Sequence, residues 1–194
     1  MYSDFSLEDI LFFSSLLMYA ELHYKPKYIF SRYYLEEPEI LADCPFRIDK
    51  GYGLPVLLLI KDSDKYPIKL NNVIIEIYNG KESLSSFKKE YNFIIKNKWW
   101  YEVVQIKPQN LFGSYKIVVK FDYEINGKKK ACLTHNYPTS KIHYLKCYFS
   151  SYLYPRYKTI TYGDLHYHTN LTDDMVEFGA PIYATLKIAE SMGL

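Results

Sequence analysis

YKIVVKFDYEINGKKKA, residues 115–131, is the stretch that decides the fold. Apolar side chains occupy every second position of residues 115–123, as they do in a strand that buries one face. Asn126-Gly127 follows, and both residues tolerate the positive φ that a tight two-residue turn demands. The stretch therefore predicts a β-hairpin that pairs residues 115–125 with residues 129–135.

Runs with strand character also occur on both sides of this hairpin. One is continuously apolar, one alternates, and three are shorter or less regular: residues 54–60, 71–78, 91–95, 99–106 and 142–149. About seven short strands separated by turn residues are typical of an antiparallel β-sandwich, and an immunoglobulin-like arrangement is one architecture that fits. We therefore expect a mainly β protein with a β-sandwich domain over residues 38–158.

The chain before the sandwich is expected to form a helical lead and connector, residues 1–37. Its apolar run covers only residues 10–20, whereas a bilayer crossing needs roughly 20 apolar residues. The first residues, MYSDFSLED, also lack the positive start of a signal peptide. We expect this helix to pack against its own protein, with no membrane as partner.

Charge and cysteine content narrow the function classes. The net charge is only +2, so there is no clear patch for nucleic acid of the kind that non-specific binding needs. Three cysteines without a CxxC pair favour a reduced, cytoplasmic location. Residues 159–194 hold five acids and one lysine, and this negative end is where a cation would bind. The oligomeric state is not predicted.

Histidines mark the candidate chemistry near the end of the chain. Residues 164–169 read DLHYHT. In an extended chain, side chains two apart share a face, so Asp164, His166 and His168 would point the same way. Neutral imidazoles are common metal ligands, and zinc, manganese and iron accept nitrogen together with carboxylate oxygen.

Carboxylates and a helix follow this short strand. Asp173 and Asp174 lie on the next loop. A helix is then expected between Pro181 and Gly193, because proline suits the first turn and glycine the residue just past the end. The order is strand, acidic loop, helix, with His166, His168, Asp173 and Asp174 as candidate metal ligands.

This order resembles the first motif of the PHP family, the polymerase and histidinol phosphatase superfamily. The resemblance covers residues 161–194 and implies the first strand and helix of a distorted β/α barrel. It also implies divalent zinc, manganese or iron ions at the strand ends and hydrolysis of a phosphorylated small molecule or a nucleotide-like substrate. We therefore expect residues 159–194 to begin a PHP-type domain that continues beyond Leu194.

The resemblance assigns the residues one by one. His166 and His168 match the motif histidines that bind metal, and Asp173 matches the acid of the usual Ser-Asp-Gly ending. Asp174 replaces the glycine of that ending, so which aspartate reaches a metal stays open. Asp164 could accept a hydrogen bond that orients a histidine ring. Alone, these residues form part of a metal centre, and this chain is expected to be catalytically incomplete.

A different hypothesis is that the sandwich binds a carbohydrate or a protein and that the C-terminal residues are an inert tail. Trp99-Trp100 carries it, because adjacent strand residues face opposite sides. One indole should lie in the core and the other should be exposed or docked. His135 and His143, in or beside strands, are expected to have structural or surface roles.

Overall fold

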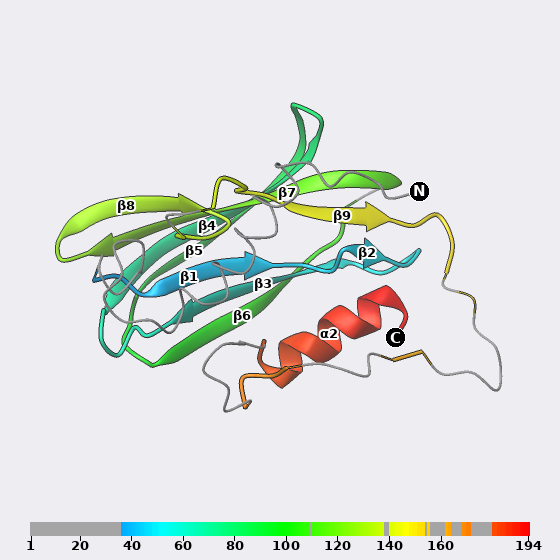
Figure 1. Ribbon diagram of the computed structural model, residues 1–194. Coiled ribbons are helices and arrows are strands. Elements are labelled where there is room, and N and C mark those ends of the chain that lie inside the picture. The colour runs from blue at the N-terminus through cyan, green and yellow to red at the C-terminus, as the bar shows by residue number, and fades with distance from the viewer. Residues whose placement is uncertain are drawn as a thin grey trace, which may run out of the picture.

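The computed structural model describes residues 36–108, 110–137, 140–153, 155, 162–163, 168–171 and 180–194. The helix expected within residues 1–37 lies outside these ranges. Figure 1 shows two layers of strands and one helix on the outer side of the smaller layer.

Nine strands and one helix make up the described fold. They are β1 (Glu39–Asp43), β2 (Arg47–Ile48), β3 (Leu54–Lys61), β4 (Ile68–Asn79), β5 (Glu82–Ile95), β6 (Trp99–Ile106), β7 (Gly113–Ile125), β8 (Lys128–Leu133), β9 (Leu145–Phe149) and α2 (Ile182–Met192). One sheet has the order β1-β3-β6 and the other the order β2-β9-β7-β4-β5, with β8 on β7. The expectation of a mainly β, sandwich-like protein is confirmed.

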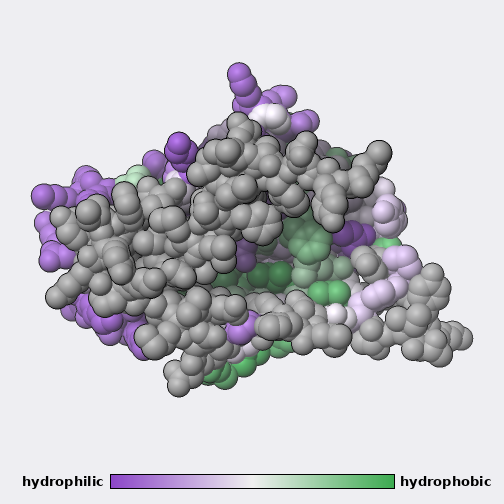
Figure 2. Space-filling view, in the orientation of Figure 1, coloured by the Kyte–Doolittle hydropathy of each residue, from purple (hydrophilic) through white to green (hydrophobic). Residues whose placement is uncertain are grey.

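The central hairpin forms at the expected turn. β7 pairs with β8 from Ile125 opposite Lys128 to Lys120 opposite Leu133. Asn126 and Gly127 have φ values of 50° and 73°, the left-handed region that this turn requires. Both this hairpin and the β4–β5 hairpin project from the core, and Figure 2 shows hydrophilic surface on them.

Two short strands were not expected from the sequence. β1 pairs antiparallel with β3, whereas β2 pairs in parallel with β9 through Arg47–Tyr148 and Ile48–Phe149. The parallel pair is the exception to the expected antiparallel order. It arises because the chain leaves the small sheet after β1 and joins the edge of the large sheet, whose strand β9 runs in the same direction.

The core lies between the two sheets and takes alternate residues of β3, β4 and β7, whereas β5 contributes one buried residue, Ile95. It includes Ile40, Val56, Leu58, Ile60, Leu70, Val73, Ile75, Ile77, Val104, Ile117, Val119, Phe121, Tyr123, Cys147 and Phe149. β3 differs from the other strands because all eight of its residues are buried. Its continuous apolar run is explained by cover on both faces: the large sheet on one side and α2 on the other.

The two sides of the sandwich close differently. On one side Ala42 donates to the carbonyl of Thr134 at 2.7 Å and Asn136 donates to that of Ile40 at 3.0 Å, which joins β1 to the chain after β8. On the other side β5 and β6 face each other, and Lys89 forms an ion pair with Glu102. Tyr91, Phe93 and Trp100 pack edge to face there, with ring centroids 5.5–6.0 Å apart.

No helix of the described residues has both the length and the apolar character that a bilayer crossing requires.

Candidate functional site

The predicted metal ligands are only partly within the described residues. His168 is described and half-buried, immediately before Thr169. His166, Asp173 and Asp174 lie outside the described residues, so their assignment as ligands stays a prediction, and so does the orienting role of Asp164, which also lies outside them. Within the described part of the chain, no group of three histidine, cysteine, aspartate or glutamate side chains is arranged to hold a metal ion.

The chain just after His168 is held next to Ala180, so the two ends of the sequence that carries Asp173 and Asp174 lie together. Thr169 forms a parallel bridge with Ala180, and the Asn170 amide donates to the Ala180 carbonyl at 3.2 Å. The Thr169 hydroxyl also accepts a hydrogen bond from the Leu171 amide at 3.2 Å. The residue after the second histidine is therefore fixed next to the start of α2.

Both ends of α2 form where the sequence predicted them. Pro181 precedes the first helical residue with extended backbone, and Gly193 ends the helix with a φ of 85°. The amides of Gly193 and Leu194 donate to the carbonyls of Glu190 and Ala189. These bonds satisfy the last carbonyls of the helix, as a left-handed glycine terminus allows.

α2 is anchored to the outer face of the small sheet. Ala184 is fully buried against Leu57 and Leu59 of β3, and the Ser191 carbonyl accepts a hydrogen bond from the Asp49 amide at 2.9 Å. The opposite face of the helix is apolar and exposed, with Leu186 at 62%. The sandwich thus covers the small side chains of α2 and leaves its larger ones at the surface.

The tryptophan pair divides as the sequence predicted. Trp100 packs against the core between the sheets, and Trp99 packs against the cluster of Leu57, Leu59 and Ala184 under α2. Lys61 lies over the Trp99 ring at 5.4 Å and pairs with the buried Glu39 at 3.5 Å. Trp99 is therefore a contact between the sandwich and the C-terminal helix.

The ring centroids of His135 and His143 lie 5.1 Å apart, a contact that the sequence did not predict. His135 Nε2 lies 2.7 Å from the Ile142 carbonyl, to which it donates, and Nδ1 accepts from the Tyr137 amide at 3.3 Å. Burial lowers the pKa of His135. Both ring nitrogens of His135 are engaged, so the pair is a structural contact, in agreement with the expected structural role.

Cys44 and Cys132 have raised pKa values. Burial, with the nearby carboxylates of Glu37 and Asp122, raises the pKa of Cys132 to about 12. Contact with Cys147 and burial raise that of Cys44. Neither environment favours the thiolate that a nucleophile needs.

No family model matches this chain, and no curated protein is similar enough to count as a relative. The geometry of the described residues therefore has to support any functional conclusion.

Proposed function

We propose that this chain is the N-terminal portion of a PHP-type, metal-dependent phosphoesterase. The observation that carries the proposal is the bridge between Thr169 and Ala180. The bridge holds Thr169, which follows the His-x-His pattern, beside Ala180 at the start of α2. These two residues lie on either side of the sequence that carries Asp173 and Asp174. A strand end, a carboxylate-bearing loop and a helix start would then meet at one point, which is the arrangement that the motif requires.

The donor set fits a borderline divalent cation. His166 and His168 would supply two imidazole nitrogens, and Asp173 or Asp174 a carboxylate oxygen, a combination that zinc, manganese and iron accept. Catalytic metal sites usually have at least three protein ligands and an open position for water. A bound ion would lower the pKa of that water and neutralise charge on phosphate oxygens.

The roles of the chain's own residues follow from this arrangement. The two imidazoles would fix the position of the ion relative to the strand end, and Asp164 would orient one of the rings by accepting its N–H hydrogen bond. The nearby carboxylates make this end of the chain negative, which attracts a cation. Residues that contact the phosphate ester would come from elsewhere in the complete enzyme.

Metal content tests the proposal directly. The protein, purified without chelator, is expected to contain zinc, manganese or iron when its metal content is measured by elemental mass spectrometry. The double variant His166→Ala/His168→Ala is expected to lose this metal. His143→Ala is the matched control, because this histidine is exposed and lies in the sandwich. Metal-free protein, or equal metal in the double variant and the control, would contradict the proposal.

The alternative, a carbohydrate- or protein-binding sandwich with an inert tail, loses its main support. It needed an exposed aromatic cluster at residues 99–101, but Trp99 packs against the α2 cluster and Trp100 against the core. Only Tyr101 is clearly exposed. A single exposed ring does not distinguish a sugar platform from ordinary surface.

A further inference from the structure

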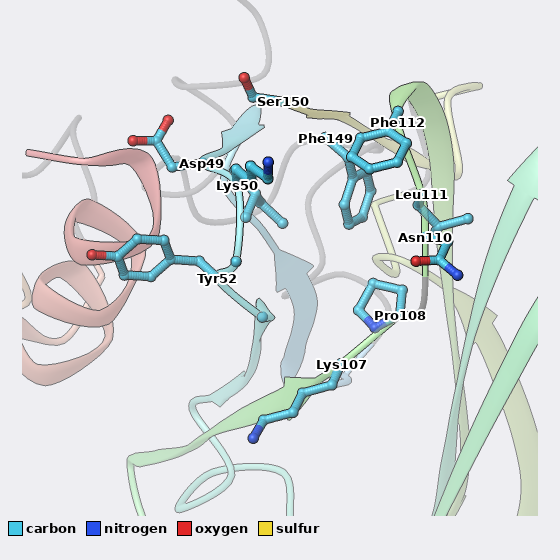
Figure 3. A pocket seen from close by; sticks show the side chains of 13 residues that line it. Asp49, Lys50, Tyr52, Lys107, Pro108, Asn110, Leu111, Phe112, Phe149 and Ser150 are labelled. Atoms are coloured by element: carbon cyan, nitrogen blue, oxygen red, sulfur yellow. The ribbon is translucent and has the colours of Figure 1, made fainter. Parts of the chain in front are cut away.

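A cleft of about 380 Å³ opens at one end of the sandwich. Three connections meet there: the turn between β2 and β3, the segment between β6 and β7, and the end of β9. Ile48 and Phe149 are buried at its base, and Phe112, 55% exposed, stands on its wall. Figure 3 shows Phe112 and Phe149 on one side of the cleft and Lys50 on the other.

The charge of the cleft is positive. Its one carboxylate, Asp49, is buried and forms an ion pair with Arg47, so its charge is compensated. Lys50 and Lys107 are exposed and have no carboxylate within ion-pair distance in the described part of the chain. An anion in this cleft would therefore meet the uncompensated ammonium group of Lys50, whereas Figure 3 shows the Lys107 side chain pointing away from Phe112 and Phe149.

The walls of the cleft are held in place without a ligand. Arg47 also donates to the Ser150 hydroxyl at 3.1 Å, and that hydroxyl donates to the Tyr152 carbonyl at 2.7 Å. The Phe149 ring packs edge to face on Tyr115 with centroids 5.5 Å apart. A site with fixed walls loses little conformational entropy on binding.

The described residues that line the cleft end at Ser150 in the sequence, before the residues of the proposed metal site. The cleft continues through Tyr52 and Lys107 into a second hollow of about 590 Å³ beside Tyr183 and Glu190 of α2. That hollow extends along α2, because Tyr183 lies in the first turn of the helix and Ser191 in its last turn.

We propose that this cleft binds a small organic anion, a carboxylate or phosphate attached to an aromatic ring. The ring would lie against Phe112 and Phe149, which offer an apolar, aromatic surface, and the anionic group would reach Lys50 on the other side of the cleft. Aromatic rings gain packing energy beyond the area that they bury. Pairing with a lysine adds a charge-assisted hydrogen bond. The inference does not depend on the phosphoesterase proposal.

Titration with phenyl phosphate, followed by amide chemical shifts, tests the site. Phenyl phosphate is expected to bind more tightly than inorganic phosphate or benzyl alcohol and to shift the amides of Gly51 and Gly53. Lys50→Gln should weaken its binding about tenfold, because the charge-assisted hydrogen bond to the phosphate is lost. Phe112→Ala should reduce the affinity for phenyl phosphate towards that for inorganic phosphate.

The control is Lys128→Gln, which removes the same charge from an exposed position outside the cleft. Equal weakening in both variants would overturn the proposal, since it would show a general charge effect. The titration is repeated with EDTA and on His166→Ala/His168→Ala, where binding is expected to persist. Loss of binding under either condition would place the ligand at the metal motif and would also overturn it.

Discussion

Gly53 lies where the start of β3 passes the end of β6. A Cβ at this position would be 2.9 Å from the Ile106 carbonyl oxygen and 3.3 Å from Gln105 Oε1. The nearest obstacle is backbone, which cannot move aside as a flexible side chain can. Gly163 offers a comparison within the same chain, because no atom of the described residues lies within 4 Å of its added Cβ.

We expect Gly53→Ala to lower the free energy of unfolding by about 1–3 kcal/mol, because the extra carbon forces the two strands apart. Gly163→Ala should stay within about 0.5 kcal/mol of the unmodified protein. Urea unfolding followed by tryptophan fluorescence measures both. Similar values for the two variants would show that the β3–β6 approach can relax.

His135 gives the protein a sensitivity to acid. Burial, and to a smaller degree His143, holds the pKa of His135 below its usual 6.5. Protons therefore bind the unfolded chain more tightly than the folded one. The stability from the neutral ring is fully present above pH 6.5 and is lost as the pH falls towards the lowered pKa.

The unfolding free energy is expected to fall between pH 7.5 and pH 5, and to fall less in His135→Gln than in the unmodified protein. His143→Gln should keep most of the pH dependence, because burial is the larger cause of the shift. Urea titrations at the two pH values give the comparison. A pH dependence unchanged in His135→Gln would assign the acid sensitivity to other groups.

At the scale of elements, β3 and α2 depend on each other. Leu57 and Leu59 point away from the main core, and Ala184 covers them. Strands with both faces covered have nearly continuous apolar sequences, and β3, with the sequence LPVLLLIK, is such a strand. The helix needs a small residue at position 184 because the sheet approaches it closely there.

Ala184→Glu should therefore lower the unfolding free energy by roughly 3 kcal/mol or more, since it buries an unpaired carboxylate. Leu186→Glu, on the exposed face of the same helix, should change it by less than about 0.5 kcal/mol. Trp99 packs at this contact, so a shift of its emission to longer wavelength should accompany Ala184→Glu. Equal effects of the two changes would mean that α2 does not pack on β3.

The elements with strong local signals could be predicted from the sequence. The alternation in β7, the Asn126-Gly127 turn and the Pro181 and Gly193 ends of α2 all act within a few residues. β2 could not be predicted, because its two residues form a strand only by pairing with β9, about 100 residues later. The immunoglobulin-like arrangement and the barrel implied for residues 159–194 stay predictions.

The two candidate sites also differ in whether they could be predicted from the sequence. The His-x-His pattern and its acids are close together in the sequence, so a metal site could be predicted from their spacing. The cleft around Lys50 could not, because Lys107 and Phe149 come from distant connections. The contact between His135 and His143 also depends on how the chain after β8 folds back.

At the scale of the whole molecule, the protection of backbone amides from hydrogen exchange should depend on where each strand lies in its sheet. Central strands β3, β4 and β7 have neighbours on both sides, whereas β5 is an edge strand with mostly exposed residues. Amide hydrogen exchange is expected to be slowest in residues 54–61 and 117–125 and faster in residues 82–94. Mass spectrometry of peptides from these regions checks the order, and slow exchange in β5 would indicate a further partner on that edge.

The burial of β3 on both faces also affects the synthesis of the protein. Its apolar residues leave the ribosome long before the tryptophan-bearing β6, and longer still before Ala184 can cover Leu57 and Leu59. At about 5–20 residues per second, that last interval is of the order of 10 s. During this time a strand-forming segment, uncharged from Leu54 to Ile60, is available to other nascent chains, so the level of chaperones should limit the yield of this protein in cells.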